Sequence, residues 1–263
     1  YTPHVFNGNY NFWKFFTLWF KYPNGTIVQK SGDTGLFVID NGTKRQVSQF
    51  VATQRKLKTD NIIILSQTEF DSYLTEKPLP PVDGTLVMGD ADPAVFLVED
   101  STRRPISFPV FQQKKYSFGK VVKIPQAEVA SYGLGAYVTP NNGSLVVGDL
   151  NKTVYLIDAE LKRPISGPVF SIRKLSFAKV IKLSDQEILS FPTGPFLTPL
   201  DKVAIKSQDD PTIFWFKDNS KQPVSAFVYK QRGIKNFPHI ILSLEEMHSI
   251  ATGTQFPPND GTV

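Results

Sequence analysis

The sequence contains no cysteine and few of the other residues that build reactive or metal-binding sites. Its 263 residues include only 3 His, 2 Met and 3 Trp. Without cysteine, disulfides and thiolate metal sites are excluded. His4, His239 and His248 lack the spacing typical of a zinc site. Phosphate-binding glycine loops, nucleophile elbows and zinc-protease motifs are also missing. We therefore expect no enzyme, with no catalytic residue, no cofactor and no bound metal.

A strong charge of one sign and long apolar runs are equally scarce. The 29 basic and 24 acidic residues leave a net charge of +5, which is too small to indicate a nucleic-acid partner. No apolar run approaches the roughly 20 residues that a membrane span needs. By contrast, 21 Phe and 20 Pro favour strands and turns over long helices.

The most informative feature is an internal repeat. The segment LKRPISGPVF at 161–170 matches TRRPISFPVF at 102–111, which lies 59 positions earlier. The same spacing links whole columns of residues without a gap, and a fixed period of this size indicates a repeat architecture. These columns include the glycines Gly25, Gly84, Gly143 and Gly261, with Lys202 at the missing step, and the serines Ser48, Ser107, Ser166 and Ser225.

The period divides the chain into one segment without a match and four units. The unmatched segment covers 1–23, and the repeats cover 24–82, 83–141, 142–200 and 201–259. Residues 260–263, DGTV, restart the first strand of a fifth copy. This strand would have nothing to complete if it belonged only to its own sheet. We therefore predict that each starting strand packs on the preceding unit and that 260–263 complete repeat 4.

Each unit is predicted to be mainly β with short helices. In repeat 2, two β-rich runs at 84–90 and 93–100 predict a hairpin, RRPIS at 103–107 a third strand, and VVKI at 121–124 a fourth. A short helix is expected over 110–116. A second helix is expected after the fourth strand of each unit. In three units Ser and Glu stand three residues apart in capping-box spacing: Ser66 and Glu69, Ser184 and Glu187, Ser243 and Glu246. Repeat 2 has Pro125 in place of the Ser. Gly135, Gly194 and Gly253 are expected to end these helices.

Two architectures accommodate four such α+β repeats. Four strands in each of four units would suit a closed four-bladed propeller. The restarted strand at 260–263 favours a linear array of tandem 59-residue units instead.

The segment before the repeats is rich in aromatic residues. Leaving so much apolar surface in water would be costly. It could pack on repeat 1 as an atypical end, dock on another copy or another surface component, or insert into a membrane surface. The candidate assembly contacts are Tyr10, Phe12, Trp13, Phe15, Phe16, Trp19 and Phe20.

The sequence resembles a repeat that is common in bacterial surface and secreted proteins. The resemblance rests on G-T-L-V, V-Y-L-I-D, K-R-P-I-S with V-F, K-V-I-K-L with S-D-Q-E, and a closing P-T-G, and it is most faithful at 83–199. Repeat 1 departs from the pattern with Gln46 in place of Pro. Repeat 4 departs from it with Gln222 in place of the second basic residue and Lys202 in place of Gly. The resemblance implies an extracellular, non-catalytic protein and supplies no catalytic residues.

Basic columns are the best candidates for recognition of an anionic glycan or wall polymer through many weak contacts. The alternative is that these cations pair across the hairpin with Asp40, Glu99 and Asp158, and we favour this structural reading. Trp215 is a further candidate sugar contact. The proposed polyanion or glycan contacts are Lys44, Arg103, Arg104, Lys162, Arg163 and Trp215, and a second basic column holds Arg55, Lys114, Arg173 and Arg232.

Asparagine and aspartate recur in the turns. Four asparagines begin N-x-Ser/Thr sequons and are candidate glycosylation sites: Asn24, Asn41, Asn142 and Asn151. Asp33, Asp92, Asn151 and Asp210 form one column, which we interpret as turn residues rather than calcium ligands.

The sequence thus indicates a non-enzymatic, extracellular repeat protein that forms a homo-oligomer or polymer, such as a surface layer, fibre or sheath, through its aromatic N-terminal segment. A module that binds a glycan or cell-wall polymer is the alternative.

Overall fold

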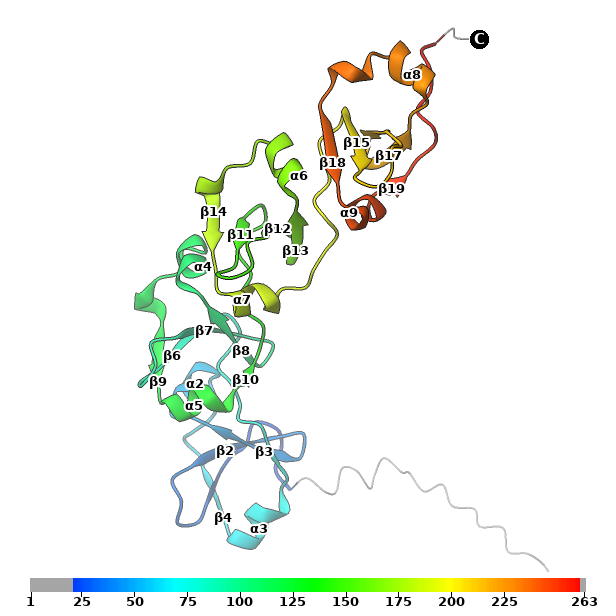
Figure 1. Cartoon of the computed structure of the whole chain (residues 1–263). Coiled ribbons are helices and arrows are strands. Elements are labelled where there is room, and N and C mark those ends of the chain that lie inside the picture. Colours follow the sequence, from blue (N-terminus) through cyan, green and yellow to red (C-terminus); the bar gives the residue numbers. More distant parts are fainter. Residues whose placement is uncertain (1–20, 261–263) are drawn as a thin grey trace, which may run out of the picture. The chain divides into compact units, whose positions relative to one another are not determined.

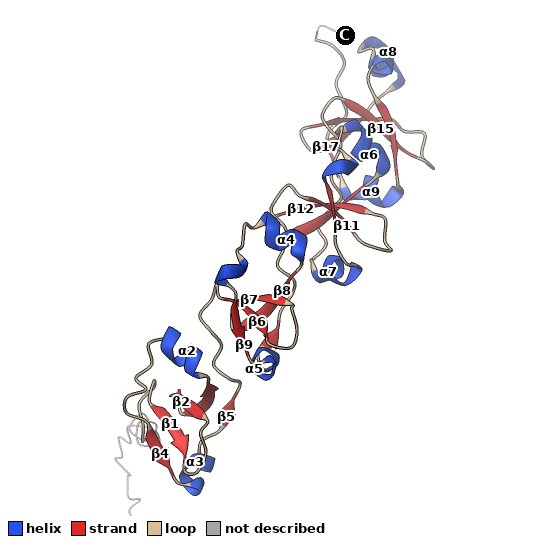
Figure 2. Ribbon diagram, turned by 90° about the vertical axis from the view of Figure 1, so that its left-hand side faces the viewer, coloured by secondary structure: helices blue, strands red, loops and turns tan. Residues whose placement is uncertain are grey.

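A computed structural model describes residues 21–260, and residues 1–20 and 261–263 lie outside the described part. Short strands form four separate sheets, and short helices follow the third and fourth strands of each sheet, which confirms the predicted β-rich class with α+β repeats (Figures 1 and 2). The chain divides into two compact units. Unit 1 holds the described residues up to 106 together with 117–135, and unit 2 holds 107–116 and the residues from 136 on.

In repeat 1, five strands form one mixed sheet in the order β4-β1-β2-β3-β5. The first three strands are antiparallel neighbours, β4 runs parallel to β1, and β5 runs parallel to β3. Two helices, α2 and α3, follow β3 and β4. The elements are β1 Ile27–Lys30, β2 Leu36–Asp40, β3 Thr43–Val47, α2 Gln49–Gln54, β4 Ile63–Leu65, α3 Gln67–Ser72 and β5 Thr75–Glu76.

Repeat 2 has the same plan, with the sheet order β10-β8-β7-β6-β9. A 3-10 turn now precedes the fourth strand. Its elements are β6 Leu86–Gly89, β7 Val95–Glu99, β8 Thr102–Ile106, α4 Phe108–Gln113, the turn Phe118–Lys120, β9 Val122–Ile124, α5 Gln126–Ser131 and β10 Gly133–Leu134.

Repeats 3 and 4 have the orders β13-β12-β11-β14 and β18-β15-β16-β17-β19. In repeat 3, a single bridge between Lys162 and Thr193 replaces the fifth strand. The elements of repeat 3 are β11 Leu145–Val147, β12 Val154–Asp158, β13 Leu161–Ile165, α6 Gly167–Ile172, the turn Phe177–Lys179, β14 Val180–Lys182 and α7 Asp185–Ser190. Those of repeat 4 are β15 Val203–Ser207, β16 Phe214–Lys217, β17 Ser220–Pro223, α8 Ala226–Gln231, the turn Ile234–Asn236, β18 His239–Leu242, α9 Leu244–Ser249 and β19 Ala251–Thr252.

The starting strand of each repeat lies inside its own sheet. In repeat 2, β6 pairs with β7 on one side and with β9 on the other. The equivalent strands β1, β11 and β15 do the same. The prediction that a starting strand completes the preceding unit is therefore wrong for these strands. The fourth strand of the same repeat already satisfies their outer edge, so that edge needs no partner from another unit.

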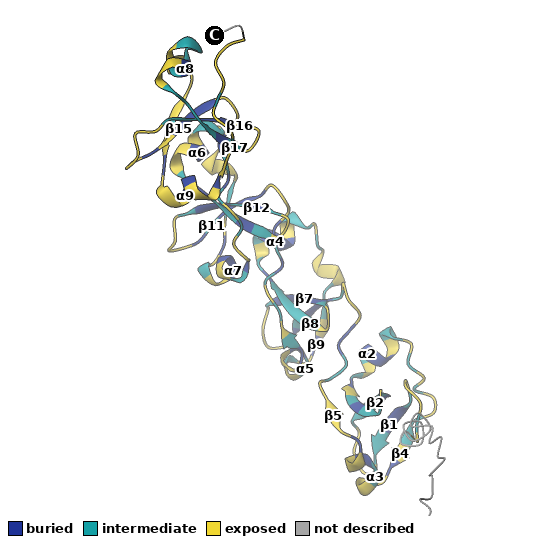
Figure 3. Cartoon of the chain, turned by 90° about the vertical axis from the view of Figure 1, so that its right-hand side faces the viewer, coloured by how far each residue is buried: buried dark blue, intermediate teal, exposed yellow. Residues whose placement is uncertain are grey.

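Consecutive repeats inside each unit are joined by a helix rather than by a strand. In unit 1, Phe50 of α2 packs against the core of repeat 2 as well as against its own. In unit 2, Val169 and Phe170 of α6 share one core with Phe216 and Leu242 of repeat 4. The first helix of one repeat therefore closes the core of the next (Figure 3).

The serine half of the predicted capping boxes is confirmed at the start of α3, α7 and α9. The Ser66, Ser184 and Ser243 hydroxyls each accept a hydrogen bond from the backbone N–H three residues on, at 3.3, 3.1 and 3.1 Å. In α5, Pro125 occupies the cap position and makes no side-chain bond. The Asp90 carboxylate accepts from the Gln126 N–H instead, at 2.9 Å.

The glycines that follow these helices have a different role from the predicted one. Helices α5 and α7 end at an aromatic residue in extended conformation, before Gly135 and Gly194 are reached. The Gly135 N–H instead donates to the Arg103 carbonyl at 3.0 Å, and a Cβ at Gly135 would lie 2.7 Å from the Thr102 hydroxyl. Glycine is needed here because the returning chain approaches the third strand closely.

A second glycine column is explained by backbone conformation. Gly25, Gly84 and Gly143 have φ of 86°, 86° and 84°, and Lys202 at the same step has φ of 66°. A side chain at such a φ is strained, so Lys202 stores strain that the other repeats avoid.

We expect Lys202→Gly to stabilise repeat 4 by up to about 1 kcal/mol, because the strain removed exceeds the added freedom of the unfolded chain. Chemical denaturation measures the change. Lys206→Gly, inside β15 and exposed, is the control and should destabilise the chain by roughly 0.5–1 kcal/mol. A destabilising Lys202→Gly would contradict the assignment of strain.

Candidate functional site: basic columns and repeat seams

The first basic column is buried rather than displayed. Lys44, Lys162 and Lys221 are 4%, 6% and 9% exposed. The Lys162 ammonium donates to the Ile188 carbonyl at 2.7 Å, near the carboxyl end of α7. Lys44 donates to the Phe70 and Tyr73 carbonyls, and Lys221 to those of Met247 and Ile250. In repeats 1, 3 and 4, these ammonium groups donate hydrogen bonds to carbonyls that would otherwise lack a partner at the end of the second helix.

Arg103 fills the same position in repeat 2, where its Nε donates to the Tyr132 carbonyl at 3.1 Å. Burial lowers the pKa of Lys44, Lys162 and Lys221 from its usual value, because desolvation disfavours the ammonium form. The charge of each ammonium group is therefore stabilised by carbonyl dipoles and is not accessible to solvent.

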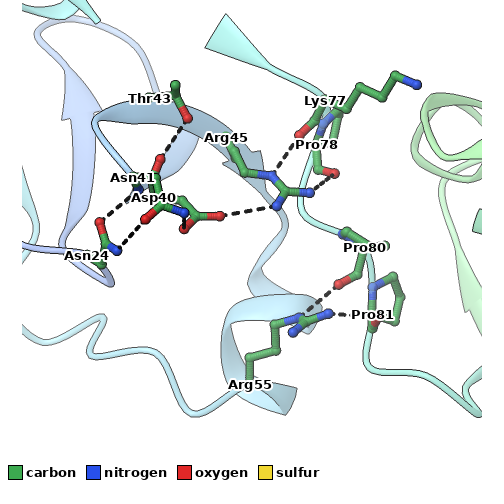
Figure 4. Close-up of polar contacts among 10 residues, drawn as sticks. All are labelled: Asn24, Asp40, Asn41, Thr43, Arg45, Arg55, Lys77, Pro78, Pro80 and Pro81. Atoms are coloured by element: carbon green, nitrogen blue, oxygen red, sulfur yellow. Dashed lines mark hydrogen bonds and ion pairs between the residues drawn. The ribbon is translucent and has the colours of Figure 1, made fainter. Parts of the chain in front are cut away.

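The neighbouring arginine column forms the cross-hairpin pairs that the sequence indicated. Arg45 contacts Asp40 at 3.2 Å, Arg163 contacts Asp158 at 3.0 Å, and Arg104 pairs with Glu99. Arg45 and Arg163 also reach the chain that leaves their repeats. Arg45 donates from Nε to the Lys77 carbonyl at 3.0 Å (Figure 4). Arg163 donates from Nε to the Pro195 carbonyl at 3.2 Å.

The second basic column fixes the proline-rich links between repeats. Arg55 donates to the Pro80 and Pro81 carbonyls at 2.9 and 3.1 Å (Figure 4). Arg173 does the same to Thr198 and Pro199, at 2.7 and 3.2 Å. Arg232 binds Pro257 and Pro258 at 2.7 and 2.6 Å. One guanidinium thus holds two successive carbonyls of a link in which proline cannot donate hydrogen bonds of its own.

Lys44, Arg103, Arg104, Lys162 and Arg163 thus use their cationic groups in contacts within the chain, in keeping with the structural reading that we favoured. Trp215, the further candidate sugar contact, is only 5% exposed. Its ring stacks on Phe256 with centroids 5.6 Å apart and meets Phe237 edge-on at 5.0 Å. Trp215 lines a surface pocket with Phe237 and Phe256, but its low exposure leaves little of the ring open to a sugar.

The candidate glycosylation residues take part in turns. Asn24 and Asn41 hydrogen-bond to each other, and the Asn151 amide nitrogen donates to the Tyr155 hydroxyl at 3.2 Å. Asn142 accepts from the Ala159 N–H at 3.1 Å through its oxygen. Its side-chain nitrogen has no partner among residues 21–260, so Asn142 is the sequon whose reactive atom is most available.

The aspartate column behaves as turn residues. The side-chain oxygens of Asp33, Asp92, Asn151 and Asp210 each accept from the N–H two residues on, at 3.0, 2.9, 2.9 and 2.8 Å. This is the Asx-turn geometry that we expected. The described residues contain no group of three or more His, Cys, Asp or Glu side chains placed to hold a metal ion. No helix within residues 21–260 has the length and apolar character needed to span a bilayer.

We call the contact surface between two consecutive repeats a seam. In unit 2 each seam contains a buried serine–glutamate contact. The Ser107 hydroxyl donates to Glu187 at 2.8 Å, and the Ser166 hydroxyl donates to Glu246 at 2.7 Å. Both carboxyls are almost fully buried, at 1% and 2% exposure. Each pair is separated by 80 residues, so each joins one repeat to the next.

The equivalent glutamates of unit 1 have other partners. Glu128 accepts from the Tyr132 hydroxyl at 2.7 Å beside a cavity of about 300 Å³ that Ser48 also lines. Glu69 accepts from Lys21 and the Tyr22 hydroxyl at 2.7 and 3.1 Å. The sequence identified Glu187 and Glu246 only as helix caps, without their bonds to Ser107 and Ser166. The constant spacing between the serine and glutamate columns was the one available signal of their second role.

Tyr22 is the described end of the aromatic segment. Its ring packs against the repeat 1 cluster that contains Phe70 and Tyr73, so the segment caps repeat 1 at this residue. The candidate assembly contacts from Tyr10 to Phe20 lie outside the described residues.

The sequence matches no protein-family model and no curated protein. Among solved structures, the chain is similar to one titled as the periplasmic assembly from the ESX-5 inner membrane complex. The identity is 9%, the TM-score is 0.21, and the match covers 97% of this chain and 95% of that chain. A second, an intact ESX-5 inner membrane complex, has 14% identity, a TM-score of 0.21 and coverage of 88% and 56%. At these TM-scores the likeness does not bear on function.

We expect Lys162→Met to destabilise unit 2 by about 1–3 kcal/mol, since it leaves the Ile188 carbonyl buried without its donor. Lys179→Met, which removes an exposed lysine, should change stability by less than about 0.5 kcal/mol. Urea denaturation compares the two variants. Equal stabilities would show that the buried ammonium has no structural role.

The buried Glu187 predicts a pH dependence of stability. Burial raises the pKa of Glu187 to about 7, against a lowering effect of the Ser107 hydrogen bond. The folded chain therefore binds more protons than the unfolded chain between about pH 4.5 and 7, and stability falls as pH rises through this window. The loss is on the order of 3 kcal/mol.

Glu187→Gln keeps an acceptor for Ser107 but does not ionise, so we expect its Tm to fall less than that of the unmodified chain between pH 5 and pH 8. Glu160→Gln, at an exposed position, is the matched control and should follow the unmodified chain. Parallel Tm curves for all three proteins would exclude the ionisation of Glu187 as the cause.

Proposed function

We propose that this chain is a non-catalytic, extracellular structural repeat protein that assembles with neighbouring copies at a cell surface. The observation that carries the proposal is the seam. A repeat completes its core with the helix of the preceding repeat, and a serine–glutamate contact joins successive repeats in unit 2. Such units are built to make contacts at their ends, as expected of repeat proteins.

The use of charged residues supports a structural role. The recurring lysines and arginines bind carbonyls of helices and links or pair with carboxylates of their own hairpins. These cationic groups therefore stabilise the fold of each repeat and the conformation of its links. The sequons and the resemblance to surface-protein repeats support the extracellular location.

In this proposal the aromatic segment supplies a contact between copies. It contains seven large aromatic side chains from Tyr10 to Phe20 with only Lys14 as a charged residue, so its burial against a neighbour would be favourable. Tyr22 shows how this part of the chain can pack, because it covers the apolar face of repeat 1.

We expect the full chain to form oligomers or filaments in light scattering and deletion of residues 1–20 to reduce their mass to that of smaller species. The deletion keeps Lys21 and Tyr22, so the described contacts to Glu69 remain. Replacing Trp13, Phe16 and Trp19 with Ser provides a variant of unchanged length. Oligomers that persist in both variants would show that the aromatic segment is not the connector.

A further inference from the structure

The end of repeat 4 carries the side chains that form a seam elsewhere, but they are more exposed there. Val47 and Ile165 are buried, whereas Val224 at the same position is half-buried. Phe111 and Phe170 are buried, whereas Tyr229 is half-buried. Phe227 is 58% exposed, and its counterpart Phe50 packs on the core of the following repeat. Much of α8 is drawn in the colours of exposed and half-buried residues in Figure 3.

The polar part of the seam is also present and incomplete. The Ser225 hydroxyl accepts from the Val228 N–H at 3.2 Å as the cap of α8. Ser166, one repeat earlier, and Ser107, two repeats earlier, each donate their proton to a buried glutamate. Within residues 21–260, no acceptor receives the proton of Ser225. The end of repeat 4 thus has a donor whose expected acceptor is the glutamate of another repeat.

Repeat 1 contains the complementary face. Its cluster of Val28, Ile39, Leu65, Phe70 and Tyr73 occupies the same repeat positions as the repeat 2 cluster on which Phe50 packs: Val87, Val98, Ile124, Val129 and Tyr132. Glu69 lies on α3 beside it, at the position of Glu187 and Glu246. No preceding repeat covers this face in the described chain, where Tyr22 packs on it and donates to Glu69.

We propose that the end face of repeat 4, formed by Val224, Ser225, Phe227 and Tyr229, binds the Glu69 face of repeat 1 in a second copy of this chain. Phe227 packs on the Phe70 and Tyr73 cluster, and Ser225 donates to Glu69. Both replace Tyr22, which occupies the place of a preceding repeat in the free chain. This inference rests on the proposed assembly function and names the surfaces that meet.

Exposed lysines near one face and exposed carboxylates near the other can pair, which favours this occupant, and Lys77 beside Glu76 is the exposed cation that such pairing would have to avoid. Lys230 and Lys235 are exposed near the end face of repeat 4, and Asp71 and Glu76 are exposed near Glu69. The Lys21 contact that must be released is largely exposed, with 66% of the lysine side chain in solvent, so its loss costs little. Association should therefore weaken as salt screens the charges.

Two variants of the full chain, each with one blocked face, test the pairing. Phe227→Asp blocks the repeat 4 face and Glu69→Arg blocks the repeat 1 face, so each alone should lower the association constant at least tenfold. Mixed together they retain one good face each and should form 1:1 dimers and nothing larger. Leu150→Asp, at an exposed loop residue, should associate like the unmodified chain. Asp71→Arg provides a second block of the repeat 1 face if Glu69→Arg does not fold.

Analytical ultracentrifugation of the mixture separates the outcomes. A dimer in the mixture, with monomers of each variant alone, supports the pairing even if deletion of residues 1–20 has no effect. Tyr22→Ala should then strengthen association, because it frees the Glu69 face. A mixture that remains monomeric, or unaltered oligomers of Phe227→Asp, would overturn the pairing. Loss of oligomers on deletion of 1–20, with no effect of Phe227→Asp, would support only the aromatic contact.

Discussion

Each repeat depends on one constraint: its small sheet has an apolar face that its own two short helices do not cover. The first helix of the preceding repeat closes this face, as Phe50 and Phe170 show in the two units. Helices of six residues have little stability of their own in water. They persist here because they are buried on one side against their own sheet and on the other against the next repeat. Fold and association between units therefore arise from the same contacts.

Charged side chains solve the problem that short elements create. A six-residue helix has as many unsatisfied carbonyls at its end as a long one. Lys44, Lys162 and Lys221 reach through the interior to satisfy these carbonyls and give up their hydration to do so. Arg55, Arg173 and Arg232 likewise donate hydrogen bonds to carbonyls of the proline-rich links. The repeated basic residues are thus the polar counterpart of the repeated apolar ones.

Much of the fold could be predicted because the period exposes which positions each unit requires. The hairpins, the third and fourth strands and the serine caps of α3, α7 and α9 follow from local patterns. The pairing of the starting strands did not, because β1 and β4 are parallel neighbours separated by more than thirty residues, and no local signal records that contact. Gly135 was assigned to a helix end because its actual constraint, the nearby Thr102 side chain, comes from a distant strand.

The candidate site was harder to predict for the same reason. The sequence alone does not distinguish a recurring lysine that faces solvent from one that binds the end of a helix. It also does not indicate that Phe256 stacks on the ring of Trp215. The arginines were better predicted, since Asp40 and Asp158 lie only five positions away in the facing strand. Glu187 was recognised as a cap, but its bond to Ser107 depends on packing between repeats.

The seam contact has a consequence for how such a chain can change in length. Donor and acceptor belong to adjacent repeats and recur at the same internal positions, as the pairs at Ser107 and Ser166 show. Duplication or loss of one whole unit recreates every seam with its serine, its glutamate and its apolar helix in register. An insertion of any other size would separate these partners. Gene duplication can therefore lengthen or shorten the protein in whole units without redesign of a single interface.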